Sequence, residues 1–203
     1  MRYIVKETPC GKIRGGDNGQ GYHTFLNISY AKAQRWERPE QVRHWEGIYD
    51  ATVPAPHCPQ SATYSAKTNP TSRFYAYESV VKQVAYYSED CQRLNIWAPE
   101  NAKNAPVLVF IHGGSYLNGG STAYSFAGNN YAKRGLVAIT INYRLNIFAS
   151  AVGGGHTGNY GLWDQITALQ WLRNNIAAFG GDPDRITIMG ESAGAMRCVA
   201  SAG

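Results

Sequence analysis

Long apolar segments are missing from this sequence of 203 residues. No run of about 18 apolar residues occurs, so we expect no membrane-spanning helix. The first eight residues, Met-Arg-Tyr-Ile-Val-Lys-Glu-Thr, also lack the apolar core of a signal peptide. These two absences lead us to expect a soluble, cytoplasmic protein.

Cysteine is also scarce. The four cysteines, Cys10, Cys58, Cys91 and Cys198, form no C-x-x-C pair and accompany no series of histidines. We therefore expect no metal site. The spacing of the four residues leaves the pairing of their thiols open.

A block of like charges is the third absence. The formal net charge of +5 comes from 19 Lys and Arg residues against 14 Asp and Glu residues, which are scattered singly along the chain. We interpret this distribution as a solvated surface and expect no nucleic-acid partner.

Apolar residues are nevertheless plentiful enough, at 44% of the chain, to form the core of one large domain. Residues 107–111, 136–141 and 185–189 are apolar stretches of strand length, typical of parallel strands covered on both faces. Residues 159–179 carry apolar side chains at three- and four-residue steps, which predicts an amphipathic helix. Residues 1–50 alternate between short apolar stretches and glycine-rich turns, as an antiparallel hairpin does. The sequence thus predicts an α/β fold: a mostly parallel central sheet with helices on both faces, and a small antiparallel N-terminal sheet.

One short motif points to nucleophilic chemistry. Gly190-Glu191-Ser192-Ala193-Gly194 matches the G-x-S-x-G pattern between a predicted strand and residues of helical propensity. In a nucleophile elbow, a tight strand-to-helix turn exposes the serine hydroxyl, and side chains in place of the glycines would collide. The alternative is an ordinary glycine-bounded turn with an exposed serine. The flanking strand and helix favour the elbow, with Ser192 as the nucleophile.

A second segment of small residues, His112-Gly113-Gly114-Ser115-Tyr116, directly follows the predicted strand 107–111. Hydrolases with a nucleophile elbow place backbone N–H groups at this position to receive the developing oxyanion. Taken alone, the segment is better explained by a strand-end histidine followed by a simple glycine loop. The two motifs together favour a serine hydrolase.

Two charged residues lie in apolar surroundings. Arg144 and Asp164 each have apolar sequence neighbours, and an unpaired charge there would be costly. We therefore predict a buried structural ion pair between them.

The sequence resembles the type-B carboxylesterase and cholinesterase family through nearly its whole length. The segments that carry the resemblance occur in the family's order. They are residues 11–15, 58–60, 88–97, 112–114, 142–145, 158–165, 179–183 and 190–194.

The resemblance implies hydrolysis of small-molecule carboxylic esters through an acyl-enzyme formed on Ser192. It implies oxyanion donors at Gly114, Ser115 and Ala193, and neither a cofactor nor a metal. It also implies that residues 1–203 are the N-terminal portion of a single α/β-hydrolase domain.

Secreted relatives bridge the positions of Cys58 and Cys91 with a disulfide. Because this chain shows no export signal, we expect the two residues to lie close together without stable oxidation.

The remaining members of a catalytic triad are not found after the nucleophile. In α/β-hydrolases the acid and the histidine follow the serine along the chain, but the eleven residues after Ser192 include no Asp, Glu or His. We therefore expect the 203-residue polypeptide alone to be inactive. Two alternatives stay open: a non-catalytic binding or adhesion relative of the fold, and an inactive truncated product. Acyl and alcohol preference and oligomeric state are not determined by these patterns.

Overall fold

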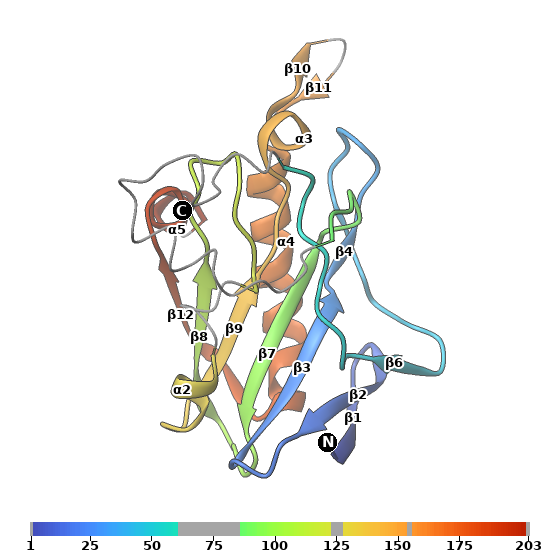
Figure 1. The fold of residues 1–203 in the computed structure, drawn as a ribbon, viewed down its shortest axis with the longest axis vertical. Helices are drawn as coiled ribbons and strands as arrows, with labels where there is room; N and C mark the ends of the chain where they lie inside the picture. Colours follow the sequence, from blue (N-terminus) through green and yellow to red (C-terminus); the bar gives the residue numbers. More distant parts are fainter. Residues whose placement is uncertain (1, 61–85, 123–127, 154–155, 202–203) are drawn as a thin grey trace.

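The computed structural model describes residues 2–60, 86–122, 128–153 and 156–201. An eight-stranded mixed sheet runs through the described residues in the order β1-β2-β3-β7-β9-β8-β12, with β6 beside β2 (Figure 1). Its strands are β1 (Arg2–Thr8), β2 (Gly11–Asp17), β3 (Tyr22–Ser29), β6 (Ile48–Asp50), β7 (Arg93–Pro99), β8 (Ala105–Ile111), β9 (Val137–Ile141) and β12 (Gly181–Gly190).

Two small hairpins and a few helices complete the fold. The hairpins are β4 (Ala31–Lys32) with β5 (Glu40–Gln41) and β10 (Val152–Gly153) with β11 (His156–Thr157). The helices are α2 (Asn129–Ala132), α3 (Asn146–Ser150), α4 (Tyr160–Asn175), the 3₁₀ helix η2 (Ile176–Phe179) and α5 (Ala193–Ser201). No helix in the described part of the chain is long and apolar enough to span a membrane.

The α/β fold is present, but the prediction of a mostly parallel sheet is wrong for the described residues. β8 is parallel to both β9 and β12, whereas β7 is antiparallel to β9. β1, β2, β3, β7 and β9 follow one another in antiparallel pairs, and only the short β6 lies parallel to β2. The N-terminal hairpin is therefore one end of the same sheet and not a separate small sheet. The three apolar runs predicted to be parallel strands, β8, β9 and β12, are parallel to one another. The prediction fails at the strands without such runs, because β1, β2, β3 and β7 extend the same sheet in antiparallel pairs.

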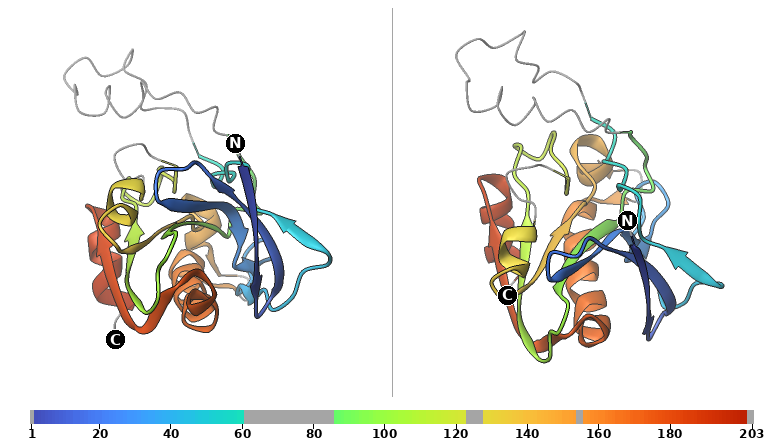
Figure 2. Two further views of the ribbon diagram at one scale, coloured as in Figure 1. Left: turned by 90° about the horizontal axis from the view of Figure 1, so that it is seen from below. Right: turned by 60° about the horizontal axis from the view of Figure 1, so that its bottom comes forward.

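The sheet has helices on both faces. Side chains alternate along β8, so that Val109 joins the core that contains Trp171 of α4, while Leu108 and Tyr131 of α2 line a small hollow on the opposite face. Figure 2 shows α4 on one side of the sheet and the one-turn helix α2 on the other.

The predicted helix over residues 159–179 is confirmed, with a change of form in its last turn. α4 ends at Asn175 and continues as the 3₁₀ helix η2 to Phe179. Gly180 ends the helix with φ of 86°, and a Cβ at this position would lie 2.4 Å from the carbonyl oxygen of Ala102. A left-handed glycine is a common helix stop, as the Gly180-Gly181 pair had suggested.

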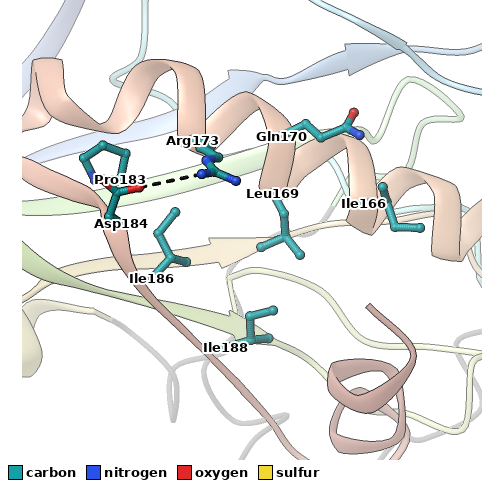
Figure 3. A pocket seen from close by; sticks show the side chains of 8 residues that line it. All are labelled: Ile166, Leu169, Gln170, Arg173, Pro183, Asp184, Ile186 and Ile188. Carbon is teal, nitrogen blue, oxygen red and sulfur yellow. Dashed lines mark ion pairs between the residues drawn. The ribbon is translucent and has the colours of Figure 1, made fainter. Parts of the chain in front are cut away.

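The prediction that residues 185–189 form a buried strand is only half right. They belong to β12, but β12 is the last strand of the sheet among the described residues, and several of its side chains are exposed. Ile186 and Ile188 face Ile166 and Leu169 of α4 across an open hollow of about 410 Å³ (Figure 3). Apolarity alone therefore did not distinguish an edge strand from a central one.

Candidate active site

The turn between β12 and α5 carries the predicted nucleophile. β12 ends at Gly190 and α5 begins at Ala193, so that only Glu191 and Ser192 join the strand to the helix. Ser192 has φ of 53°, in the left-handed region that residues other than glycine seldom adopt. The N–H of Ala195 donates to the Ser192 carbonyl oxygen at 3.0 Å, which starts the helix at once. The strained turn presents the exposed Ser192 at the end of the strand.

Two glycines allow this turn to form. A Cβ on Gly190 would lie 2.4 Å from the carbonyl carbon of Gly194. A Cβ on Gly194 would lie 2.1 Å from the carbonyl oxygen of Ile111 at the end of β8. Because both distances are far below van der Waals contact, any side chain at either position would push α5 away from the sheet.

The loop of residues 112–119, called the 112–119 loop below, lies against the same turn. A Cβ on Gly113 would lie 2.6 Å from the carbonyl oxygen of Glu191 and 3.1 Å from the Cβ of Ser192. β8 and β12 are parallel neighbours, with Ile111 paired to Gly190, so the two segments leave the same end of the sheet. The structure thus brings the two sequence motifs together.

The backbone of this loop is turned by consecutive left-handed residues. Gly114, Ser115 and Tyr116 have φ of 103°, 55° and 62°. The carbonyl oxygen of Gly114 accepts a hydrogen bond from the N–H of Leu117 at 2.9 Å. In the described part of the chain, the N–H groups of Gly114, Ser115 and Ala193 meet no protein acceptor, so they can donate to a ligand.

His112, the first residue of the 112–119 loop, packs on Tyr143 and contacts the backbone of Gly113. Its ring stacks on Tyr143 with centroids 4.5 Å apart, and its Nδ1 lies 2.8 Å from the carbonyl oxygen of Gly113. Burial lowers the pKa of His112 from its usual value of 6.5 to about 4, so the imidazole is neutral at pH 7. Among the described residues no histidine hydrogen-bonds the Ser192 hydroxyl, and no three His, Cys, Asp or Glu side chains are grouped as metal ligands.

The model of the Carboxylesterase family matches residues 3–201. The chain belongs to the carboxylesterase family. Para-nitrobenzyl esterase of Bacillus subtilis (strain 168) is 37% identical over 210 residues, covering 98% of this chain and 40% of the esterase. Neuroligin-2 of Mus musculus is 36% identical over 231 residues, covering 96% of this chain and 27% of the neuroligin.

Solved structures of carboxylesterase-family proteins share the fold. A thermophilic PNB esterase matches with a TM-score of 0.83 at 37% identity, covering 98% of this chain and 41% of the esterase chain. The chain therefore spans about two-fifths of the length of these esterases.

The cysteine pair that the carboxylesterase family implied is also brought together. Cys58 and Cys91 are free, buried thiols. A hydrogen bond with the Cys58 thiol, together with burial, raises the pKa of Cys91 well above its usual value. The N–H of Leu145 donates to the Cys58 sulfur at 3.2 Å, which ties the pair to the segment after β9.

The predicted ion pair between Arg144 and Asp164 is present, and Arg144 is the residue before Leu145. Arg144 donates from Nε to Asp164 Oδ2 at 2.9 Å and from Nη2 to Oδ1 at 2.7 Å. The backbone N–H of Arg144 adds a third bond to Oδ2 at 2.9 Å, and the Arg144 Nη1 donates to the carbonyl oxygen of Glu37 at 2.8 Å. Both side chains are buried, so the charges are shielded from water and satisfied by each other.

Two residues near the site escaped the sequence reasoning. His57 Nε2 lies 2.6 Å from the hydroxyl oxygen of Thr122, and burial lowers its pKa. Gln60 contacts the backbone of Gly119 at the end of the 112–119 loop. Their only sequence signal was their place in or beside the Cys58-Pro59-Gln60 motif, because their partners lie about 60 residues further along the chain.

Proposed function

We propose that this chain carries the nucleophile and the oxyanion-binding groups of a carboxylic ester hydrolase. The observation that carries the proposal is the closeness of Gly113 to the strained Ser192 turn, which brings the 112–119 loop next to an exposed serine. A small-molecule ester fits this arrangement because its carbonyl carbon needs a nucleophile and its oxygen needs donors.

The reaction follows from these groups. Ser192 Oγ attacks the carbonyl carbon and loses its proton to a base, while the carbonyl oxygen becomes an oxyanion held by Gly114, Ser115 and Ala193. Collapse of the tetrahedral intermediate expels the alcohol, which takes up the proton, and leaves an acyl group on Ser192. Water then repeats the attack and releases the carboxylic acid. Each oxyanion donor contributes about 10²- to 10³-fold to the rate in enzymes of this kind.

Among the residues that the structure describes, no side chain is placed to act as the base. A serine hydroxyl without an adjacent base is a weak nucleophile near neutral pH, and the neutral His112 is turned toward Gly113. We therefore expect the 203-residue polypeptide alone to hydrolyse esters at a rate close to background. The N-terminus of α5 beside Ser192 favours the oxyanion but does not replace a base.

A fluorophosphonate probe tests the proposal, because it reacts covalently with activated serines. The source extract is treated with the probe, and the intact mass of every polypeptide that contains the Ser192 peptide is determined. Labelling at Ser192 in a polypeptide larger than 22.3 kDa is the expected result, because a base must then come from other residues.

Two results bear on the alternatives. If a 22.3 kDa form is present without label, the polypeptide of this length is catalytically silent. If no polypeptide containing the Ser192 peptide reacts, the hydrolase proposal is overturned in favour of a non-catalytic binding relative. Recombinant Ser192→Ala lacks the hydroxyl oxygen that the probe modifies. Any label on this variant must therefore lie on another residue.

A further inference from the structure

The side-chain amide of Gln60 forms two reciprocal hydrogen bonds with the backbone of Gly119. The N–H of Gly119 donates to Gln60 Oε1 at 2.8 Å, and Gln60 Nε2 donates to the carbonyl oxygen of Gly119 at 2.9 Å. The second hydrogen of Nε2 is used by the carbonyl oxygen of Cys58 at 3.0 Å. All three bonds agree on one orientation of the amide, so its position is determined.

Gly119 is the point where the 112–119 loop returns to its own beginning. A Cβ on Gly119 would lie 2.4 Å from His112 Nδ1 and 2.7 Å from the carbonyl oxygen of Gly113. Gly119 therefore packs directly on the residue that touches Ser192. A group that holds Gly119 in place holds both ends of the loop.

The segment that carries Gln60 is itself anchored on its other side. Asn142 Nδ2 donates to the carbonyl oxygen of Pro56 at 2.8 Å, and Asn146 Nδ2 donates to that of Pro59 at 2.8 Å. Both asparagines follow β9, which neighbours β8 in the sheet. Gln60 thus connects the 112–119 loop to a segment that is itself hydrogen-bonded to residues following β9.

We infer that Gln60 is the positioning residue of the oxyanion-binding loop: its amide holds Gly119 against Gly113 and so fixes the N–H groups of Gly114 and Ser115 beside Ser192. The inference rests on the hydrolase function proposed above. Gln60 does not touch the reacting atoms. Its effect comes through geometry, because the donors of an oxyanion hole act only when they are placed before the charge develops.

The first test follows the loop directly, without any need for activity. Backbone amide NMR spectra of the 203-residue chain are compared for wild type, Q60M and Q60E, with Q170M, at an exposed position of α4, as the matched control. Methionine keeps the length of the side chain but removes both bonds to Gly119. Glutamate keeps the acceptor for the Gly119 N–H and loses the donor.

We expect the amide resonances of Gly114 and Ser115 to shift and broaden in Q60M, to change less in Q60E, and to be unchanged in Q170M. The side-chain amide of Gln60 bonds to Cys58 and Gly119 and not to Gly114 or Ser115 among the described residues, so a response at Gly114 and Ser115 reports positioning and not a local contact. Changes confined to Gly119 and the neighbours of Gln60 would overturn the inference. If Q60M fails to fold, the comparison of Q60E with wild type decides in the same way.

The second test uses the fluorophosphonate reaction at Ser192, in which a phosphonyl oxygen enters the same donor group. In the polypeptide form that the extract experiment finds to react with the probe, we expect Q60M to react at least about 10-fold more slowly than wild type and Q170M to react at the wild-type rate. Equal rates for Q60M and wild type would overturn the positioning role. If wild type itself does not react, the hydrolase proposal fails, and the amide spectra alone decide whether Gln60 positions the loop.

Discussion

Gly113 lies so close to Ser192 that a Cβ on the glycine would approach the serine Cβ to 3.1 Å. This contact joins the end of β8 to the end of β12, two strands that are neighbours in space but separated by most of the C-terminal half of the chain. Because the contact involves backbone as well as side-chain atoms, small changes at Gly113 should be transmitted directly to the nucleophile.

Gly113→Ala is expected to destabilise the chain by about 1 to 3 kcal/mol, because the added methyl would lie 2.6 Å from the Glu191 carbonyl oxygen. Urea unfolding measures the change. Gly21→Ala is the control: nothing lies within 4 Å of its added Cβ, so it reports only the strain of a positive φ. A Gly113→Ala variant as stable as wild type would show that the elbow and the loop are not in contact.

Asp164→Asn should cost about 3 to 5 kcal/mol of unfolding free energy, because it leaves the buried charge of Arg144 without its partner. The matched control is Asp184→Asn, which removes the carboxylate from an exposed pair with Arg173 and should change stability by less than about 1 kcal/mol. Thermal melting followed by circular dichroism compares the two. Similar melting temperatures for both variants would contradict a stabilising role for the buried pair.

Stability should fall as the pH is lowered from about 6.5 toward 4. The folded-state pKa of His112 is about 4, below its usual value of 6.5, so in this range the unfolded chain binds a proton that the folded chain does not. Acid therefore favours unfolding, and His112 alone accounts for a loss of roughly 3 kcal/mol once the pH is below its folded pKa. The lowered pKa of His57 acts in the same direction.

Urea unfolding midpoints at several pH values measure this dependence. His112→Gln should flatten it, whereas His44→Gln, which changes an exposed side chain, should leave it as in wild type. An unchanged slope in His112→Gln would mean that His112 titrates normally in the folded state.

Cys58 and Cys91 should resist alkylation in the folded chain. Both are buried, and the thiol contact raises the pKa of Cys91, which lowers its thiolate fraction at neutral pH. Iodoacetamide labelling followed by peptide mass spectrometry should modify the partly exposed Cys198 first and all four cysteines after denaturation. Recovery of a Cys58–Cys91 disulfide from freshly isolated protein would contradict the expectation that the pair is reduced.

The nucleophile turn could be predicted from sequence because its causes are local. Gly190 and Gly194 are needed within the turn itself, and the strand and helix that flank them have their own sequence patterns. The helix over residues 159–179 was equally predictable from its apolar spacing. Its change to a 3₁₀ turn before Gly180 was not, because the spacing of apolar residues does not distinguish the two helix forms over a single turn.

The sequence by itself determined the two glycine-rich motifs, the candidate nucleophile and the charged residues that need partners, since each is expressed in neighbouring residues. Only the tertiary structure decided the direction of β7, the edge position of β12 and the closure of the 112–119 loop by Gln60. These features depend on contacts between residues far apart in the chain. Apolar patterning specifies which side chains are buried, but strand pairing and hydrogen bonding between distant segments specify where they meet.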